Sequence, residues 1–180
     1  MLKKISVLLL AVGVILAPNG ANASTHAKSL QNLGMNEIMF AQMMIPHHKQ
    51  AVSISETAMK KSQNQAILRL SRQIKSAQNT EISQMTYWLK ATNSSMTMDH
   101  DMKMSGMLTV KELASLKSLT GTEFDRTFLA LMIKHHQGAL EMIDLISDSK
   151  NAEAKALSKA IDSAQRKEIT SMKQLLKKLK

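Results

Sequence analysis

The chain has 180 residues, which suits one domain, and its lack of cysteine excludes disulfides and thiolate metal sites. Its formal charge of +10 would suit nucleic acid or an anionic surface, but most basic residues are scattered along the chain. The lysines clustered at 173–180 complement the dipole of a C-terminal helix, so at most a weak membrane-surface contact is expected. The unusual residue is methionine, with 15 copies against 3% aromatic residues.

Residues 1–23 have the layout of a secretory signal peptide. Two lysines precede an apolar run from Ile5 to Ala17, and small residues follow at alternating positions. This run is too short to span a bilayer comfortably, so cleavage is expected rather than an uncleaved anchor. The mature protein should begin near Ser24 and lie in the periplasm, which argues against nucleic acid as its partner.

Residues 24–34 form an N-terminal tail, and residues 35–180 contain an internal duplication. The motif Phe-x-x-x-Met-Ile-x-His-His-x-x-Ala occurs twice, and each copy continues to Ile-x-Ser-Ala-Gln-x-x-Glu-Ile-x-x-Met. The first motif occupies residues 40–51 and 128–139, and the second occupies residues 74–85 and 161–172. The two copies, at 35–92 and 120–180, flank a linker at 93–108.

The repeated segments have the periodicity of amphipathic helices. Apolar residues from Ile74 to Leu89 recur at three- to five-residue spacing, and no convincing run alternates as a half-buried strand would. Two helical hairpins with matching apolar faces can bury those faces against each other. We therefore predict an all-α, ferritin-like four-helix bundle with a pseudo-twofold axis.

Local signals refine this prediction. Capping boxes at Thr109–Glu112 and Thr120–Glu123 mark two further helix starts. The first box predicts a short helix that ends near Leu119 and precedes the second copy. Pro46 removes a hydrogen bond inside a predicted helix, so a bend is expected directly before His47.

The linker is the most specific signal for metal binding. Thioether ligands are soft and select Cu(I), or Ag(I) as its mimic, and the flanking Asp99 and Asp101 favour a cation. We expect a mobile loop whose ligands converge without help from the fold, rather than a polar linker that happens to be rich in methionine. Its candidate ligands are Met96, Met98, His100, Met102, Met104 and Met107.

The duplicated His-His motif supplies a second group of candidate ligands. In each copy, a methionine stands three residues before the first histidine and four before the second. Residues at these spacings share a face of a helix, so the methionine can converge with at least one of the histidines. Adjacent histidines diverge by about 100°, so one can point inward while its neighbour meets another partner or solvent. The alternative is a set of hydrogen-bonded core histidines. The ligands predicted here are Met44, His47, His48, Met132, His135 and His136.

Other methionines extend these sites. Met85 and Met172 end the second motif and could approach the histidine-bearing helices, although methionine also fills irregular gaps in a core. Met142 could extend the second site, whereas Ile54 stands at the matching place in the first copy, so the two sites need not be equivalent. A packing role is predicted for the remaining methionines, with a site near the N-terminus as the alternative for the first three: Met35, Met39, Met43 and Met59.

These motifs resemble the domain-of-unknown-function family 305. The resemblance runs from about Met35 to Lys178, with His-His-x-x-Ala and Gln-x-x-Glu-Ile-x-x-Met in both halves. Some members are periplasmic copper-binding proteins of the CopM type, so the resemblance implies a ferritin-like bundle and a role in copper binding or resistance. It points to the same helical methionines and histidines, and Ile54 departs from the methionine usual in the family.

The residues and the resemblance together predict a protein that sequesters or shuttles Cu(I), with Ag(I) as a mimic and Cu(II) accommodated by the histidines. It would act without turnover, and another periplasmic copper-handling protein is a potential partner. Two alternatives stay open. A ferritin-like metal oxidase would need Glu-x-x-His pairs, which the sequence lacks. An envelope interaction module would expose methionines without convergent histidines.

Overall fold

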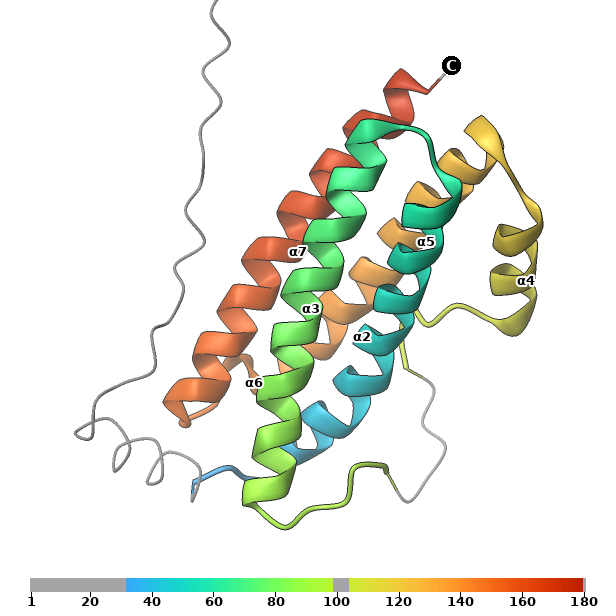
Figure 1. The fold of residues 1–180 in the computed structure, drawn as a ribbon. Helices are drawn as coiled ribbons and strands as arrows, with labels where there is room; N and C mark the ends of the chain where they lie inside the picture. Colours follow the sequence, from blue (N-terminus) through green and yellow to red (C-terminus); the bar gives the residue numbers. More distant parts are fainter. Residues whose placement is uncertain (1–31, 99–103, 180) are drawn as a thin grey trace, which may run out of the picture.

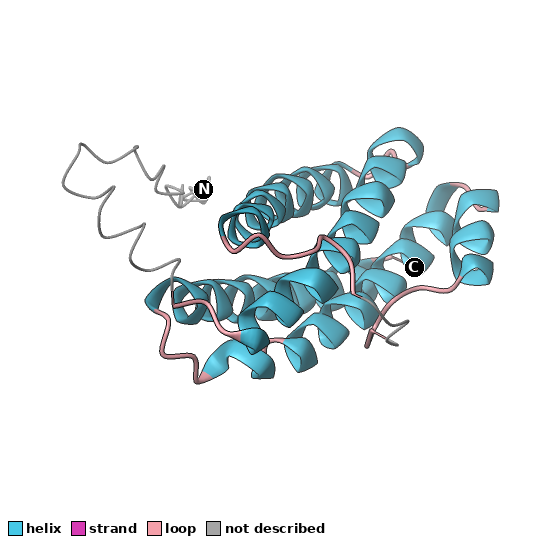
Figure 2. Cartoon of the chain, turned by 90° about the horizontal axis from the view of Figure 1, so that it is seen from below, coloured by secondary structure: helices cyan, strands magenta, loops and turns pink. Residues whose placement is uncertain are grey.

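The computed structural model describes residues 32–98 and 104–179, and the regular elements within these residues are all helices (Figures 1 and 2). The expected signal peptide and most of the tail lie outside the described residues, as do His100 and Met102. None of the described helices is long and apolar enough to cross a membrane. The helices are α2 (Met35–Lys61), α3 (Gln65–Ala91), α4 (Val110–Ser118), α5 (Gly121–Met142), α6 (Asp144–Ser147) and α7 (Ala152–Lys178).

Four long helices form two hairpins. Helix α2 packs along α3, α5 packs along α7, and the two hairpins meet mainly through α2 and α5 (Figure 1). The short α6 lies in the connection between α5 and α7. The predicted all-α bundle of two hairpins is therefore confirmed, with the first motif on α2 and α5 and the second motif on α3 and α7.

The duplication extends into the turns that start α3 and α7. The Asn64 side chain accepts a hydrogen bond from Ala66 N–H (3.0 Å), and Asn64 N–H donates to Ser62 Oγ (3.1 Å). In the second copy the Asn151 side chain likewise accepts from first-turn N–H groups, and its own N–H donates to Ser149 Oγ. Such caps satisfy N–H groups that a first helical turn leaves without partners. A Ser-x-Asn turn thus fixes the start of both return helices.

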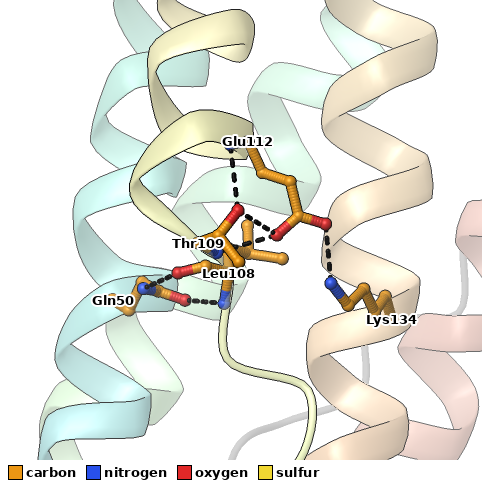
Figure 3. Close-up of polar contacts among 5 residues, drawn as sticks. All are labelled: Gln50, Leu108, Thr109, Glu112 and Lys134. Atoms are coloured by element: carbon orange, nitrogen blue, oxygen red, sulfur yellow. Dashed lines mark hydrogen bonds and ion pairs between the residues drawn. The ribbon is translucent and has the colours of Figure 1, made fainter.

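Helix α4 packs against α5 and is held by side chains (Figure 3). Thr109 and Glu112 form the predicted capping box, with the Thr109 hydroxyl accepting from Glu112 N–H at 3.2 Å. Hydrogen bonds from Lys134, at 2.6 Å on α5, and then from Thr109 lower the pKa of Glu112 to about 2. Gln50 of α2 bonds the Leu108 carbonyl at 3.0 Å and the Leu108 N–H at 2.8 Å, which ties the preceding loop to the first hairpin.

Two other local predictions have different outcomes. Thr120 precedes α5, but its side chain makes no capping hydrogen bond, so the second capping box is wrong. Gly121 begins that helix with a left-handed backbone, at φ +59°. The first residue of α5 is therefore not helical in the way that a capping box requires. Helix α2 is continuous through Pro46, and the bend expected there stays a prediction.

The interior contains two apolar clusters, which we name by their contents. The methionine end is the cluster that includes Phe40, Met44, Met85, Trp88 and Met142. The α4 end is the cluster that includes Ile54, Leu116, Phe124, Phe128, Met132 and Met172. In the methionine end, α2 contributes residues that precede its His-His pair and α3 contributes residues that follow Gln78. Helix α5, in contrast, contributes residues that follow its His-His pair. Each end therefore combines both copies of the duplication.

A polar layer separates the two ends. On all four long helices, the change from one apolar cluster to the other falls at buried polar side chains. Burying polar groups without partners is costly, so a layer of this kind in the middle of a bundle requires an explanation. Its buried members are His47 and His48 on α2, Gln78 on α3, His135 and His136 on α5, and Gln165 on α7.

Candidate metal centre

The two His-His pairs meet at the centre of the bundle, where all four side chains are fully buried. The rings of His47 and His135 face each other across the interface of the hairpins, with centroids 3.7 Å apart and planes tilted by 34°. The rings of His48 and His136 lie farther out, 6.3 and 6.4 Å from their sequence neighbours. The two histidines of each pair thus have different surroundings, as their divergence on a helix predicts, but neither reaches solvent.

Each outer histidine contacts a glutamate from the return helix of its own hairpin. His48 Nε2 lies 2.7 Å from Glu81 Oε2, and His136 Nε2 lies 2.7 Å from Glu168 Oε2. The second contact is a hydrogen bond, whereas the first has the distance of an ion pair but falls outside hydrogen-bond geometry. A carboxylate of this kind orients an imidazole ring and raises its basicity as a ligand.

The inner histidines break the symmetry of the layer. His47 Nε2 lies 3.0 Å from the carbonyl oxygen of Ser105, and it must donate the hydrogen bond because a carbonyl only accepts. Nδ1 of His47 then keeps its lone pair, and no described residue forms a hydrogen bond with it. Within residues 32–98 and 104–179, neither ring nitrogen of His135 has a partner in hydrogen-bond geometry. The layer therefore holds unprotonated ring nitrogens that are available to a ligand.

Both inner histidines are held in the neutral form. Burial is the main cause that lowers the pKa of His47 to about 3, and the nearby His48 and His136 lower it further against the effect of Ser105. Burial also lowers the pKa of His135 well below its usual value, followed by the charges of His47, His136 and His48. Neutral imidazole is the form that binds metals, so these rings need not lose a proton first.

Two glutamines complete the polar layer. Gln78 and Gln165 are each 2% exposed, and neither their amide oxygens nor their amide nitrogens have a hydrogen-bond partner among the described residues. They precede Glu81 and Glu168 by one helical turn, so glutamine and glutamate share a face of their helix. Unpartnered buried polar atoms cost about 1–3 kcal/mol each, which favours a ligand or water at this level of the bundle.

The two glutamates stand in the second motif, four residues before Met85 and Met172, so they can approach the histidine-bearing helices together with those methionines. Their pairing with the outer histidines is what the sequence did not predict, and it comes from α3 and α7. The available signal was a charged residue repeated at the same place in the second motif, between an inward glutamine and an inward methionine.

The helical methionines predicted as ligands are buried, and they divide unequally between the two ends. Met44 and Met85 lie in the methionine end, whereas Met132 and Met172 lie in the α4 end. Met142 also lies in the methionine end, beside residues of the first copy. The end of α5 lies next to the start of α2 in this arrangement, and the expectation that Met142 extends the second site stays a prediction.

Methionines predicted to be packing residues reinforce this end. Met43 is buried in it, and Met39 packs against it from a half-buried position. Met35 is 76% exposed and does not pack, so its predicted role is wrong, because it is the first residue of α2 and lies outside the bundle. Met59 is half-buried near the end of α2.

The linker is anchored where the structure describes it. Met98 and Met104 pack against the methionine end, Met96 is 40% exposed, and Met107 is half-buried. The side chain of Gln42 donates to the carbonyls at 95 and 97 (2.9 and 3.3 Å), and residue 105 contacts His47. The described part of the linker is therefore held against the bundle. Two of its candidate ligands, Met98 and Met104, pack beside candidate ligands of the helices.

A pair of glycines lets the linker approach the histidine layer. A Cβ atom added to Gly138 of α5 would lie 2.1 Å from the Ser105 carbonyl oxygen, which no side chain can tolerate. Gly106 packs in return, because its own Cβ would lie 2.8 Å from the His135 carbonyl, and its φ is +74°. The linker thus covers the layer directly above His47 and His135.

The donor set of the layer is incomplete without sulfur. Within residues 32–98 and 104–179, no three His, Cys, Asp or Glu side chains converge as a metal site. A site at the layer would need further donors, and α2, α3 and α5 each carry thioethers of the methionine end beyond their part of the layer. The arrangement therefore fits soft or borderline ions better than ions that require several carboxylates.

The fold and the layer define a class of all-α proteins in which two helical hairpins enclose buried histidine pairs. The chain belongs to the family described as Domain of unknown function (DUF305), whose family model matches residues 37–176. No protein with curated functional records matches the sequence.

Several solved structures share the fold. A DUF305 fragment from Deinococcus radiodurans is 30% identical, with a TM-score of 0.74 over 81% of this chain and 97% of that one. A DUF305 protein from Streptomyces coelicolor, classed as secreted, is 26% identical, with a TM-score of 0.77 over 80% and 93%. CopM in its Cu(I)-bound form is 28% identical, with a TM-score of 0.66 over 79% and 96%. CopM was also solved with Cu(II) and with Ag bound.

Proposed function

We propose that this protein is exported and binds copper and silver ions, which it sequesters or shuttles without turning over a substrate. The observation that carries the proposal is the methionine end, where seven methionines of the described part of the chain lie beside a layer of four buried histidines. Four of these methionines are buried and three pack against them from half-buried positions. The relation to CopM, which was solved with Cu(I), Cu(II) and Ag bound, supports the same class of ion for this chain.

The chemistry of the donors favours monovalent soft ions. Thioether sulfur binds Cu(I) and Ag(I) in preference to hard ions, and neutral imidazole binds both oxidation states of copper. The chain has no cysteine, so thioether is its only soft donor apart from imidazole. We therefore expect the methionine end to hold Cu(I) or Ag(I), with Cu(II) limited to the histidines.

The alternatives receive less support. A ferritin-like metal oxidase uses carboxylates from four helices, whereas the carboxylates at this layer are Glu81 and Glu168 from two helices. An interaction module would display its methionines. Among the described residues only Met35 and Met96 are largely exposed methionines, and the others are buried or half-buried.

A competition titration tests the proposal. The purified protein is titrated with Cu(I), Ag(I), Cu(II) and Zn(II) against chelators of known affinity, and bound ions are counted after dialysis. We expect Cu(I) and Ag(I) to bind most tightly, because soft ions gain most from thioether ligands. Tighter binding of Zn(II) than of Cu(I) would contradict the soft-ligand argument, and failure of all four ions to bind would end the proposal.

A second experiment separates linker from bundle. In one variant the linker methionines are changed to leucine, and in the other the four histidines are changed to glutamine. Because Met98 and Met104 pack against the methionine end, we expect the linker variant to lose more than its own ions and to weaken binding in the bundle. If the linker variant binds as much Ag(I) as the parent, the linker methionines are only packing residues. The linker positions are Met96, Met98, Met102, Met104 and Met107.

A further inference from the structure

A groove runs between α3 and α7, the two helices that do not carry the His-His motif. The helices lie side by side along one face of the bundle (Figure 1) but contact each other sparsely, and the space between them has a volume of about 700 Å³. Small side chains keep this space open, and they are Ser76, Ala77 and Thr80 on α3 and Ala156, Ala160 and Ala164 on α7.

Two carboxylates connect this groove with the buried layer. Glu81 and Glu168 line the groove and are 14% and 17% exposed, while the same carboxylates lie 2.7 Å from Nε2 of His48 and His136. Both histidines have no exposed surface of their own. Each glutamate therefore spans the distance between solvent in the groove and a ring in the layer.

The opposite face of the layer is covered. There the backbone at residues 105 and 106 packs so closely on α5 that Gly138 has no room for a Cβ atom. On this face, His47 Nε2 also donates a hydrogen bond to the Ser105 carbonyl. Within the described residues, the α3–α7 groove is thus a side from which the layer has contact with an opening.

The charge of the groove also suits a cation. The whole chain carries +10, which repels cations in general. The groove has two carboxylates against one lysine, Lys167, among its lining residues. Low-dielectric walls focus the field of such charges and raise the local concentration of ions of opposite sign.

We propose that the α3–α7 groove is the entrance through which a metal cation reaches the histidine layer, with Glu81 and Glu168 as the positioning residues that attract it. This rests on the proposed function, because it assumes that the protein binds such ions. The two glutamates act through His48 and His136, at whose nitrogens the cation arrives, and the small side chains of the groove leave it room to pass.

Stopped-flow mixing with Ag(I) tests the entrance, because Ag(I) is a redox-silent probe. The single tryptophan, Trp88, is buried in the methionine end and serves as an internal fluorescence reporter. The change Ala160→Phe obstructs the groove from an exposed position, and Ala91→Phe places the same side chain on α3 outside the groove. We expect Ala160→Phe to slow association at least about tenfold with little change in the equilibrium affinity, and Ala91→Phe to leave both unchanged.

The double variant E81Q/E168Q tests the electrostatic part, and E56Q/E123Q removes the same charge away from the groove. Steering by charged clefts changes association rates by about 10- to 1,000-fold and depends on ionic strength. We expect E81Q/E168Q to slow association about tenfold and to lose most of its dependence on salt, whereas the control retains both. A parent-like rate in Ala160→Phe, with parent-like equilibrium binding, would overturn the entrance while leaving the proposed function intact. A parent that binds no Ag(I) would instead refute the proposed function.

Discussion

The two ends of the bundle have duplicated backbones but different side-chain chemistry. Among the described residues, the methionine end holds seven methionines, whereas the α4 end holds two, Met132 and Met172. Met142 and Ile54 occupy matching positions of the duplication, and both are less than 6% exposed. Met142 lies in the methionine end, whereas Ile54 lies in the α4 end. The α4 end is filled instead by Phe124 and Phe128, whose rings stack with an interplanar angle of 11°.

This difference separates what the fold requires from what a metal requires. Methionine and isoleucine have similar volumes, so either side chain can fill the core without changing the backbone. Only one of them carries a sulfur ligand. A symmetric backbone can therefore carry an asymmetric set of donors, and the shared histidine layer can serve one end more than the other.

Acid should break the layer that both ends share, and this is the largest effect we expect. Unfolded His47 takes up a proton below its ordinary pKa of 6.5, whereas the folded form does not until about pH 3. The unfolded state thus binds more protons in this window, so the free energy of unfolding falls as pH falls, by about 1.4 kcal/mol per pH unit for each such histidine. His135, whose pKa is also lowered, adds to the slope.

Urea denaturation of the metal-free protein between pH 7 and 4 measures this slope. The double variant His47→Gln/His135→Gln is the control, and it should lose most of the dependence on pH between these limits. A parent whose free energy of unfolding is constant across the window would show that the inner histidines are not held neutral.

Removing the sulfur of the methionine end should produce the next largest effect. The triple change of Met44, Met85 and Met142 to leucine preserves volume, so each substitution should cost less than about 1.5 kcal/mol of stability. We expect Ag(I) affinity to fall on the order of a hundredfold, equivalent to about 2.7 kcal/mol. Chelator competition measures the affinity. The matched control, Met132 and Met172 to leucine, should lose less, and equal losses would remove the functional distinction between the ends.

The change Gly138→Ala should loosen the cover of the layer. Its Cβ atom would clash with the backbone of Ser105, and overpacking of this kind costs about 1–3 kcal/mol. Because the linker carries Met98 and Met104 to the methionine end, Ag(I) affinity should fall together with stability. The exposed neighbour Gln137 provides the control, since Gln137→Ala should change the free energy of unfolding by less than about 0.5 kcal/mol. Unchanged Ag(I) affinity in Gly138→Ala would show that the linker contributes nothing to the site.

The smallest effect should come from adding sulfur to the α4 end. The change Ile54→Met places a third methionine beside Met132 and Met172 at nearly constant volume. We expect a gain of Ag(I) affinity at this end of roughly tenfold, or about 1.4 kcal/mol, and little change in stability. The variant with Met44, Met85 and Met142 changed to leucine weakens binding at the methionine end. Adding Ile54→Met to this variant and titrating it with Ag(I) therefore reports on the α4 end. No gain there would mean that the α4 end lacks the geometry of a site.

The sequence predicted the parts of this molecule that depend on local patterns. The hairpins follow from repeated apolar periodicity, the start of α4 from the Thr109–Glu112 box, and the histidine layer from the repeated pair. Contacts between helices were harder to predict. The placement of Met142 and the contacts of Glu81 and Glu168 depend on which helix faces which, and spacing along one helix does not contain that information.

One residue in the sequence indicates where the linker is anchored. Gly138 stands inside a helix, where glycine costs about 1 kcal/mol relative to alanine. Such a glycine often marks the close approach of another backbone, here that of Ser105. The linker could therefore have been placed against α5, although the packing of Met98 and Met104 could not.

The two His–Glu contacts have a consequence for how such a protein can evolve. His48 pairs with Glu81 inside the first hairpin and His136 with Glu168 inside the second, so each half brings its own complete pair to the interface. Two identical copies of one hairpin could build the same layer as a homodimer, but every change would then appear at both ends. Fusion of the halves into one gene removes that constraint. A single chain can acquire Met142 and keep Ile54, so one end can specialise while the other maintains the fold.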